Sequence, residues 1–410
     1  MALKLSRIYG RPGAFSFLHR LPLSRCVSSS SQERPAGTLY ICGTGEYNKL
    51  GVGDLQDREA PALVEELRDV PIVHVACGKY HTAAVSASGD VYTWGLESSG
   101  QLGLGSSKTK AATPQKVEAL SGMGVKQLSC GSYHTLALTD AGEVYSFGFG
   151  GSFFNGAGGL GHGDRRQLDT PRRIETFGPE RGIIATSVGA GGYHSIVLDS
   201  ERRVWSWGRG EWGRLGFGDS SDVLDPQHLE ECDGYVPISS PCGEAHSACL
   251  AADGRIFTWG RNEHWQLGFE VVGLLNSGQS FDSQAEPTQV PFPDECRCIK
   301  VSCGELGTAA LMEDKSLWMW GMRRFFEPTA LPGMEIVQGQ VTQLECGASH
   351  LALLTDFGKV YTYGKGTALA MKKADRKSWE LAEVTALPEE GRKVVSIACG
   401  SNSTALILES

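Results

Sequence analysis

Cysteine, glycine and histidine recur along this chain in one short pattern. The segments "CGKYHTAAV" (77–85) and "CGSYHTLAL" (130–138) are nearly identical and start 53 residues apart. Thiolate and imidazole groups are the ligands that zinc prefers, and a histidine can also act as a general base. The pattern is therefore a candidate for metal or acid–base chemistry, and the number of its copies decides between chemistry and architecture.

Seven copies are present; the other five read "AGGYHSIVL" (190–198), "CGEAHSACL" (242–250), "CGELGTAAL" (303–311), "CGASHLALL" (346–354) and "CGSNSTALI" (399–407). Ligands of one metal ion must lie within a few ångströms of each other, whereas residues that occur once per repeat are spread over the whole fold. We therefore predict no metal site and expect the cysteines to be small packing residues near a central axis. The residues in this slot are Cys77, Cys130, Ala190, Cys242, Cys303, Cys346 and Cys399.

The motif histidines follow the same logic. A catalytic group needs to occur only once, so a repeated histidine is better explained as a hydrogen-bonding brace between loops. Two further segments, "GAGGLG" (156–161) and "GRGEWG" (208–213), fit a dinucleotide fingerprint, but neither is followed by the helix that would hold a pyrophosphate. We predict no catalytic residue, no cofactor and no enzymatic activity. The motif histidines are His81, His134, His194, His246 and His350.

The elements that position these residues are short strands. Each copy is followed by a turn and a second apolar segment, as in "SASGDVYTWG" (86–95), and then by a loop such as "GQLGLG" (100–105). Alternating apolar residues on both sides of a glycine turn are typical of a β-hairpin. The last copy stops at Ser410, and its missing half, "TLYICGTGEYNKLGVG" (38–53), lies at the start of the chain. We predict an all-β, seven-bladed β-propeller over residues 38–410, closed by pairing of the N- and C-terminal strands in one blade, and monomeric.

This repeat resembles that of the regulator of chromosome condensation family. The shared unit is Cys-Gly-x-x-His-(Thr/Ser), then Gly-x-Val-(Tyr/Phe)-x-Trp-Gly, then Gly-Gln-Leu-Gly, and the resemblance covers residues 38–410. The family implies seven-bladed propellers, but a propeller is a platform shared by unrelated activities. Organelle-targeted members imply an assembly or stability factor, and the founding nuclear member implies a guanine-nucleotide exchange factor for a small GTPase.

The first 32 residues differ from the rest. They contain Lys4, Arg7, Arg11, Arg20 and Arg25, and the first acidic residue is Glu33. An Arg- and Ser-rich segment without acids is typical of a mitochondrial transit peptide, with a plastid one as the alternative. We therefore predict a transit peptide over residues 1–32 and a mitochondrial matrix location.

Charge and hydropathy limit the partners. No run of about eighteen apolar residues occurs, so we predict no membrane span. Removal of residues 1–32 takes away five of the 38 basic residues, which leaves 33 against 47 acidic ones and a net charge of −14. Such a charge disfavours unaided binding to RNA, which remains possible through a partner or a local basic patch.

Partner-binding residues are expected where the repeat is irregular. The segments are "FGGSFFNGAGG" (149–159), "FEVVGLLNSGQSFDSQAEP" (269–287) and "GTALAMKKADRKSWE" (366–380). We predict a non-enzymatic mitochondrial scaffold, an assembly or stability factor for a large complex such as the mitochondrial ribosome or for organellar RNA. The alternative is an exchange factor for a small or mitochondrial GTPase. The candidate partner-binding residues are Phe153, Phe154, Val271, Val272, Leu274, Leu275, Lys372, Lys373, Arg376 and Lys377.

Overall fold

The structure is a computed structural model that describes residues 35–105, 110–152, 156–239, 241–271, 283–293, 296–371, 379–387, 389 and 391–410. Residues Pro35–Ser410 form one unit by their internal contacts. Within the described ranges the ordered elements are β-strands and short 3₁₀ turns, and no helix there has the length and hydropathy needed to cross a membrane. The 3₁₀ turns are η1 (Glu46–Asn48), η2 (Glu65–Leu67), η3 (Glu118–Leu120), η4 (Pro179–Arg181), η5 (Glu211–Gly213), η6 (Glu230–Tyr235), η7 (Met334–Ile336) and η8 (Thr367–Leu369).

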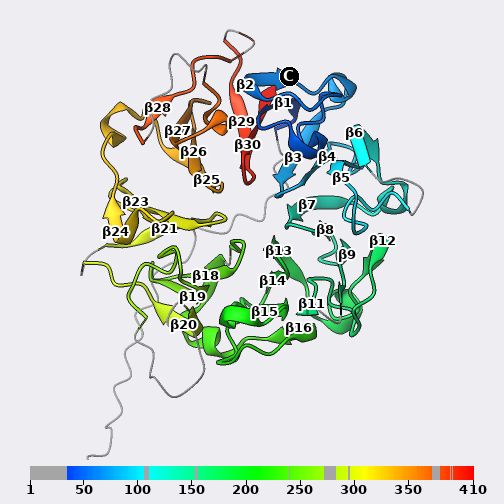
Figure 1. Cartoon of the computed structure of the whole chain (residues 1–410), viewed down its shortest axis with the longest axis vertical. Helices are drawn as coiled ribbons and strands as arrows, with labels where there is room; N and C mark the ends of the chain where they lie inside the picture. The colour runs from blue at the N-terminus through cyan, green and yellow to red at the C-terminus, as the bar shows by residue number, and fades with distance from the viewer. Residues whose placement is uncertain are drawn as a thin grey trace, which may run out of the picture. The chain divides into compact units, whose positions relative to one another are not determined.

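Five four-stranded antiparallel sheets, or blades, are arranged around a central channel (Figure 1). In each blade the strand nearest the channel comes first in the chain. The strands are β7 (Val125–Cys130), β8 (His134–Thr139), β9 (Val144–Gly148) and β12 (Leu168–Arg173); β13 (Ala185–Ala190), β14 (His194–Asp199), β15 (Val204–Gly208) and β16 (Val223–His228); β17 (Pro237–Ser239), β18 (His246–Ala251), β19 (Ile256–Arg261) and β20 (Ser283–Gln289); β21 (Cys298–Cys303), β22 (Gly307–Met312), β23 (Leu317–Gly321) and β24 (Phe325–Ala330); β25 (Val341–Cys346), β26 (His350–Thr355), β27 (Val360–Gly364) and β28 (Ala382–Glu383). A small hairpin, β10 (Gly151–Ser152) with β11 (Gly156–Ala157), projects from the loop after β9.

The remaining strands form one eight-stranded sheet. Its order is β29-β30-β1-β3-β4-β5-β6, and β2 pairs with β1. The prediction of seven blades is therefore wrong, because the described strands make five four-stranded blades and one sheet of eight. The cause is a backbone pairing between Gly37 of β1 and Ile72 of β3, which joins the two ends of the repeat into a single sheet. The strands are β1 (Gly37–Gly43), β2 (Arg58–Leu63), β3 (Ile72–Cys77), β4 (His81–Ser86), β5 (Val91–Leu96), β6 (Lys110–Lys116), β29 (Val394–Cys399) and β30 (Ser403–Glu409).

The two ends of the described unit pair directly with each other. β1 and β30 are antiparallel and in register from Gly37 opposite Glu409 to Gly43 opposite Ser403. These strands, blue and red in Figure 1, lie side by side although they are more than 360 residues apart. An antiparallel ladder of this length leaves no open strand edge at that point of the ring.

The second strand of each repeat is buried on both sides. β4, β8 and β14 are each buried at every residue because each lies between neighbouring sheets. Their sequences are accordingly runs of small and apolar residues without clear alternation. The Trp-Gly step in the next strand has a steric reason: Gly95 has a φ of +116°, and a Cβ there would come within 2.7 Å of the His81 Cα.

Indole rings fill the space between the sheets. Trp94, Trp207, Trp259 and Trp320 are fully buried, as is Phe147 in the equivalent place. The aromatic residue before each of these glycines therefore packs in the interior between repeats. Each large ring buries about 150–250 Å² of surface, so the tryptophans dominate the inter-sheet contact.

Candidate functional site

The Cys-Gly loops of all seven repeats meet at one mouth of the central channel. The channel has a volume of about 550 Å³, and a smaller hollow of about 90 Å³ lies at this mouth. In five of the seven repeats the residue after the Cys-Gly pair lines this mouth: Lys79, Ser132, Glu244, Glu305 and Ser401. Sequence reasoning treated these positions as background, and they carry the charged groups of the site.

Five side chains form a hydrogen-bonded group that we call the mouth cluster: Lys79, Ser132, Glu244, Glu305 and Ser401. The Lys79 Nζ lies 2.9 Å from a carboxylate oxygen of Glu305 and 3.3 Å from one of Glu244. The Ser132 hydroxyl donates to Glu244 at 2.6 Å, and the Ser401 hydroxyl donates to Glu305 at 2.7 Å. The cluster therefore connects repeats on opposite sides of the channel.

The electrostatics of the mouth cluster favour charged side chains. Burial lowers the pKa of Lys79, but the two carboxylates raise it more, and the pKa lies above its ordinary value. The exposed fractions of the Lys79, Glu244 and Glu305 side chains are 27%, 24% and 21%. One ammonium between two carboxylates leaves a net charge of −1 that is rigidly held and still reachable from solvent.

A glycine in the third repeat makes room for this cluster. Gly192 occupies the position that carries Lys79 in the first repeat and Ser132 in the second. A Cβ at Gly192 would come within 2.5 Å of the Glu244 backbone oxygen and 2.8 Å of its Cδ. The departure of "AGGYH" from the repeat thus allows Glu244 to reach across the mouth.

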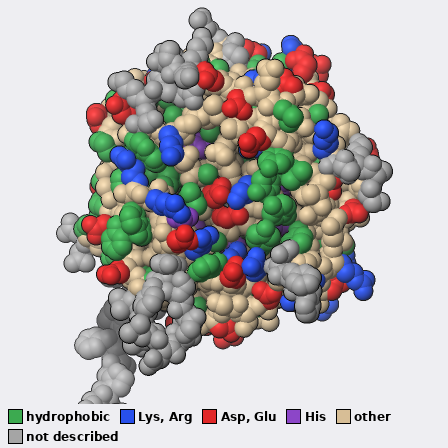
Figure 2. Space-filling model, in the orientation of Figure 1, with side chains coloured by type: hydrophobic (Ala, Val, Ile, Leu, Met, Phe, Trp, Pro, Cys, Tyr) green, Lys and Arg blue, Asp and Glu red, His purple; other side chains and the backbone are tan. Residues whose placement is uncertain are grey.

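Aromatic rings lie beside the mouth cluster and form what we call the aromatic patch: Tyr47, Tyr80, Tyr133, Phe149 and Tyr193. Neighbouring ring centroids are 5.1–6.4 Å apart. Burial and a hydrogen bond with Tyr133 raise the pKa of Tyr80, so its phenol stays neutral at physiological pH. Figure 2 shows hydrophobic side chains beside acidic and basic ones around the centre of this face.

Several exposed or half-buried aromatic residues in the loops of this face have a strained backbone. Tyr47, Trp212 and Trp265 have φ values of +61°, +67° and +65°. The left-handed region is unfavourable for a residue with a side chain, and such strain concentrates at functional sites. A cation lies over one of these rings, since the Arg261 Cζ is 5.1 Å from the Trp212 centroid, and another lies over the aromatic patch, where the Arg209 Cζ is 5.6 Å from the Tyr193 centroid.

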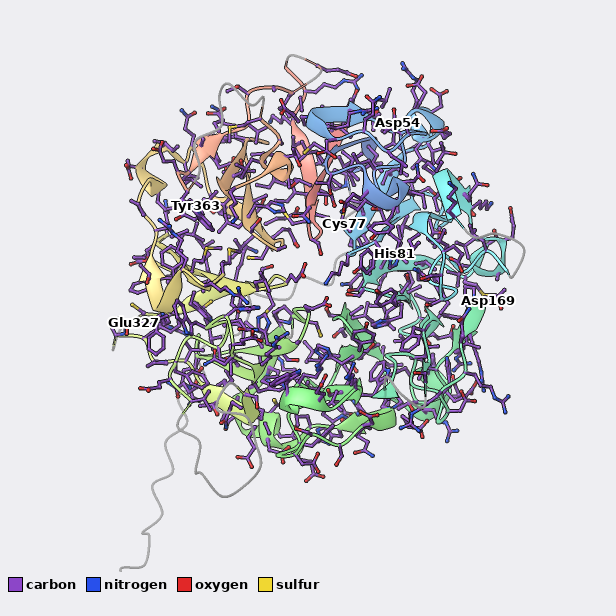
Figure 3. All side chains as sticks on the ribbon, in the orientation of Figure 1. Asp54, Cys77, His81, Asp169, Glu327 and Tyr363 are labelled. Carbon is purple, nitrogen blue, oxygen red and sulfur yellow. The ribbon has the colours of Figure 1, made fainter. Side chains whose placement is uncertain are left out.

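The motif histidines are structural, as predicted. The His81 Nε2 lies 2.7 Å from the Thr135 hydroxyl of the next repeat, and that hydroxyl donates to the Gln101 carbonyl at 2.9 Å. The hydroxyl must therefore accept from His81, which fixes the neutral ring with its proton on Nε2. The same bridge joins His134 to Ser195, His194 to Ser247, His246 to Thr308 and His350 to Thr404. Figure 3 shows Cys77 closer to the channel than His81.

The cysteines of the repeat line the channel. Some of them are only half-buried, because the axis beside which they pack is hollow. Burial raises the pKa of Cys77 to about 12, so its thiol is protonated and a poor nucleophile or metal ligand. Within the described ranges, no three His, Cys, Asp or Glu side chains are grouped so that they could hold a metal ion.

Most of the predicted partner-binding residues lie outside the described residues, and so they stay a prediction. Val271 is described and is half-buried. The loops that contain them begin and end at the same end of the strands as the Cys-Gly loops, since each follows the third strand of its blade. The residues outside the described ranges are Phe153, Phe154, Val272, Leu274, Leu275, Lys372, Lys373, Arg376 and Lys377.

The mouth cluster was missed, although a signal for it exists in the sequence. The position after the conserved glycine reads Lys79, Ser132, Gly192, Glu244, Glu305, Ala348 and Ser401. Opposite charges in one repeat slot close to a central axis indicate ion pairs across that axis. The arrangement combines fixed charges with half-exposed aromatic rings, and such surfaces bind other molecules.

Comparison with known proteins supports the family suggested by the repeat. Residues 34–330 match the model of the RCC1-like domain. The chain is 33% identical to the ultraviolet-B receptor UVR8 of Arabidopsis thaliana over 283 residues, which is 69% of this chain and 60% of that protein. It is 29% identical to the human E3 ubiquitin-protein ligase HERC2 over 387 residues, 90% of this chain but 8% of HERC2. The chain thus spans less than two thirds of the length of these relatives.

An organellar relative and a solved structure complete the comparison. The RCC1 domain-containing protein RUG3, mitochondrial, of Arabidopsis thaliana is 28% identical over 343 residues, 82% of this chain and 73% of that protein. The crystal structure of Prp20p from Saccharomyces cerevisiae has a TM-score of 0.77, with 21% identity and 92% of both chains covered. With its propeller fold, its repeat and the match over residues 34–330, this chain belongs to the RCC1-like domain family.

Proposed function

We propose that this protein is a non-enzymatic mitochondrial scaffold that binds a protein component of a large complex, such as the mitochondrial ribosome, and supports its assembly or stability. The observation that carries the proposal is the face formed by the mouth cluster and the aromatic patch. It presents rigid, half-exposed rings around a fixed charge network, which is the composition of a protein-binding surface.

Charge favours a protein over RNA as the direct partner on this face. The Lys79 ammonium is neutralised by Glu244 and Glu305. Arg209 is likewise paired with Glu211 at 2.9 Å. Paired cations contribute little to phosphate binding, so contact with organellar RNA is expected through the protein partner.

The mitochondrial location is supported by the acid-free leader and by the similarity to RUG3. It is tested by fusing residues 1–32 to a fluorescent protein and recording its location in cells. Colocalisation with a mitochondrial marker is expected. A diffuse cytosolic signal, or a signal confined to plastids, contradicts this part of the proposal.

The partner is tested by quantitative affinity purification of the tagged full chain from mitochondria. We expect ribosomal proteins of the organelle to be enriched and to be lost in a Tyr80→Ala, Tyr133→Ala variant. Met123→Ala is the matched control, because Met123 is an exposed apolar residue at the opposite end of the strands, in the loop before β7. If the wild type, the double variant and the Met123→Ala control all enrich the ribosomal proteins equally, and their thermal transitions are unchanged, the aromatic patch is not the binding surface.

A second candidate function is guanine-nucleotide exchange. It is favoured by the fold shared with Prp20p, whose structure was described with its binding properties to Gsp1p and histones. A nucleotide-release assay with a mitochondrial GTPase recovered in the purification separates the two functions. Accelerated release of labelled GDP by the wild-type chain supports exchange, and release at the intrinsic rate supports the scaffold.

A further inference from the structure

A second surface lies at the opposite end of the strands from the mouth cluster. A groove of about 500 Å³ runs between the blade β21–β24 and the blade β25–β28. Its walls are Ile299 of β21, the turn from Met312 to Ser316 and the segment from Met334 to Val341. This volume is in the range of ligand pockets, about 300–1,000 Å³, so it can receive side chains but not a folded domain.

The groove continues into exposed apolar surface. Ile299 lines both the groove and the channel and is 47% exposed. Ile336 and Phe357 are 43% and 58% exposed. The Phe357 ring lies against Gly339 in the groove wall, since a Cβ at Gly339 would be 3.2 Å from its Cδ2. Large exposed apolar side chains gathered beside an apolar groove are typical of a binding site.

The rim of the groove is acidic. Glu313 and Asp314 line it, Glu335 follows Met334 in its wall, and Asp356 accepts from the Gln340 backbone N–H at 2.8 Å. Lys315 is the cation among the described lining residues. Two nearby basic residues are directed elsewhere: Lys300 lines the channel, and the Arg297 guanidinium donates to the Asp253 backbone oxygen at 3.2 Å. Lys393 packs beside Gly358, next to Phe357.

We infer that this groove is a docking site for a protein segment that carries large apolar side chains flanked by Lys or Arg. The apolar walls take the apolar side chains, and the acidic rim pairs with the flanking cations. The inference goes beyond the proposed function, because the groove lies at the end of the strands opposite the mouth cluster and would hold a segment separate from the one that contacts the aromatic patch; it rests on that function for its biological meaning. RNA is disfavoured because its phosphates would meet four carboxylates.

The test is fluorescence anisotropy of the purified full chain with a labelled twelve-residue peptide, Lys-Leu-Leu-Lys repeated three times. We expect saturable binding that weakens at least about tenfold for Ile299→Asp and for Phe357→Asp. We also expect weakening at higher salt and in the Glu313→Gln, Asp314→Asn variant. Met123→Asp, at the same end of the strands and outside the groove, is expected to bind like the wild type.

The outcomes are decisive in both directions. Equal binding by the wild type, Ile299→Asp and Phe357→Asp overturns the inference, as does equal binding of a peptide with Glu in place of every Lys. A dimer that becomes a monomer in Ile299→Asp also overturns it, because the groove is then an interface between copies of this chain. If the organellar complex is still recovered by a chain that binds no peptide, only the groove assignment fails; if the peptide binds but no complex is recovered, only the proposed function fails.

Discussion

At the scale of single residues, Lys79 is the centre of the charge network. It is the cation of the mouth cluster and contacts carboxylates 165 and 226 residues away in the chain. Without it, Glu244 and Glu305 would face each other with no counter-charge between them. The network therefore links repeats that lie on opposite sides of the channel.

We predict that Lys79→Met lowers the free energy of unfolding by about 1–2 kcal/mol, a value reduced from that of a fully buried pair because these side chains are about a quarter exposed. Urea unfolding measures this. The Lys79→Met, Glu305→Gln double variant should recover most of the loss, since one repelling charge is removed. Unfolding of Lys79→Met at the wild-type urea concentration contradicts the role assigned to the network.

At the scale of elements, five of the seven repeats are fastened to the next by one histidine. The ring of His246 bonds to the Thr308 hydroxyl at 2.9 Å, and that hydroxyl donates to the Gln266 carbonyl at 2.9 Å. The Trp320 indole donates to the same carbonyl at 2.9 Å. A buried loop carbonyl thus receives two donors, and the histidine determines how one of them is oriented.

We predict that His246→Ala destabilises the protein by about 1–3 kcal/mol, because it leaves the Thr308 hydroxyl without its donor in the core. Ser403→Ala is the matched control: Ser403 holds the histidine slot of the last repeat, and its buried hydroxyl faces the Cys77 thiol, a weak hydrogen-bonding group. Loss of the Ser403 hydroxyl should change the free energy of unfolding by less than about 0.5 kcal/mol. Equal losses in the two variants would show that the slot acts through packing alone.

The repeat made much of this architecture predictable and some of it not. The roles of the histidines and of Trp94 follow from their recurrence at a fixed place in each hairpin. The pairing of β1 with β3 through Gly37 and Ile72 could not be predicted. A sequence repeat gives the number of units, but it does not show which strand edges of neighbouring units form hydrogen bonds. The mouth cluster depends on contacts across the channel, and the distance between repeats there is set only when the ring is formed.

At the scale of the whole molecule, the buried rings make stability depend on pH. Burial lowers the pKa of His81 and His246 to about 3 and that of His134 and His350 to about 4, and it places that of His194 well below its ordinary value. Because the folded pKa is depressed, the unfolded chain takes up protons first as the pH falls below about 6.5. Between this pH and its own folded pKa, each histidine lowers the free energy of unfolding by about 1.4 kcal/mol for every unit by which the pH falls.

We predict that the thermal transition is constant near neutral pH and falls steeply between pH 6.5 and 4. Two carboxyl groups oppose this trend, because burial raises the pKa of Glu97 and Glu345 to about 7, but five rings outnumber them. Calorimetry at a series of pH values measures the slope. His246→Gln should reduce the slope by the share of one ring, whereas a transition that rises on acidification contradicts the neutral state assigned to these histidines.

The central claim is that the face bearing the mouth cluster and the aromatic patch contacts a protein of a mitochondrial complex. The most direct measurement places a photo-cross-linking amino acid at position 80 in the full chain, and at position 123 as the control, and identifies the cross-linked proteins by mass spectrometry. The account predicts that position 80 yields one dominant cross-link to a ribosomal protein of the organelle and that position 123 yields none. Cross-links of the same protein from both positions, or from position 123 alone, would contradict it.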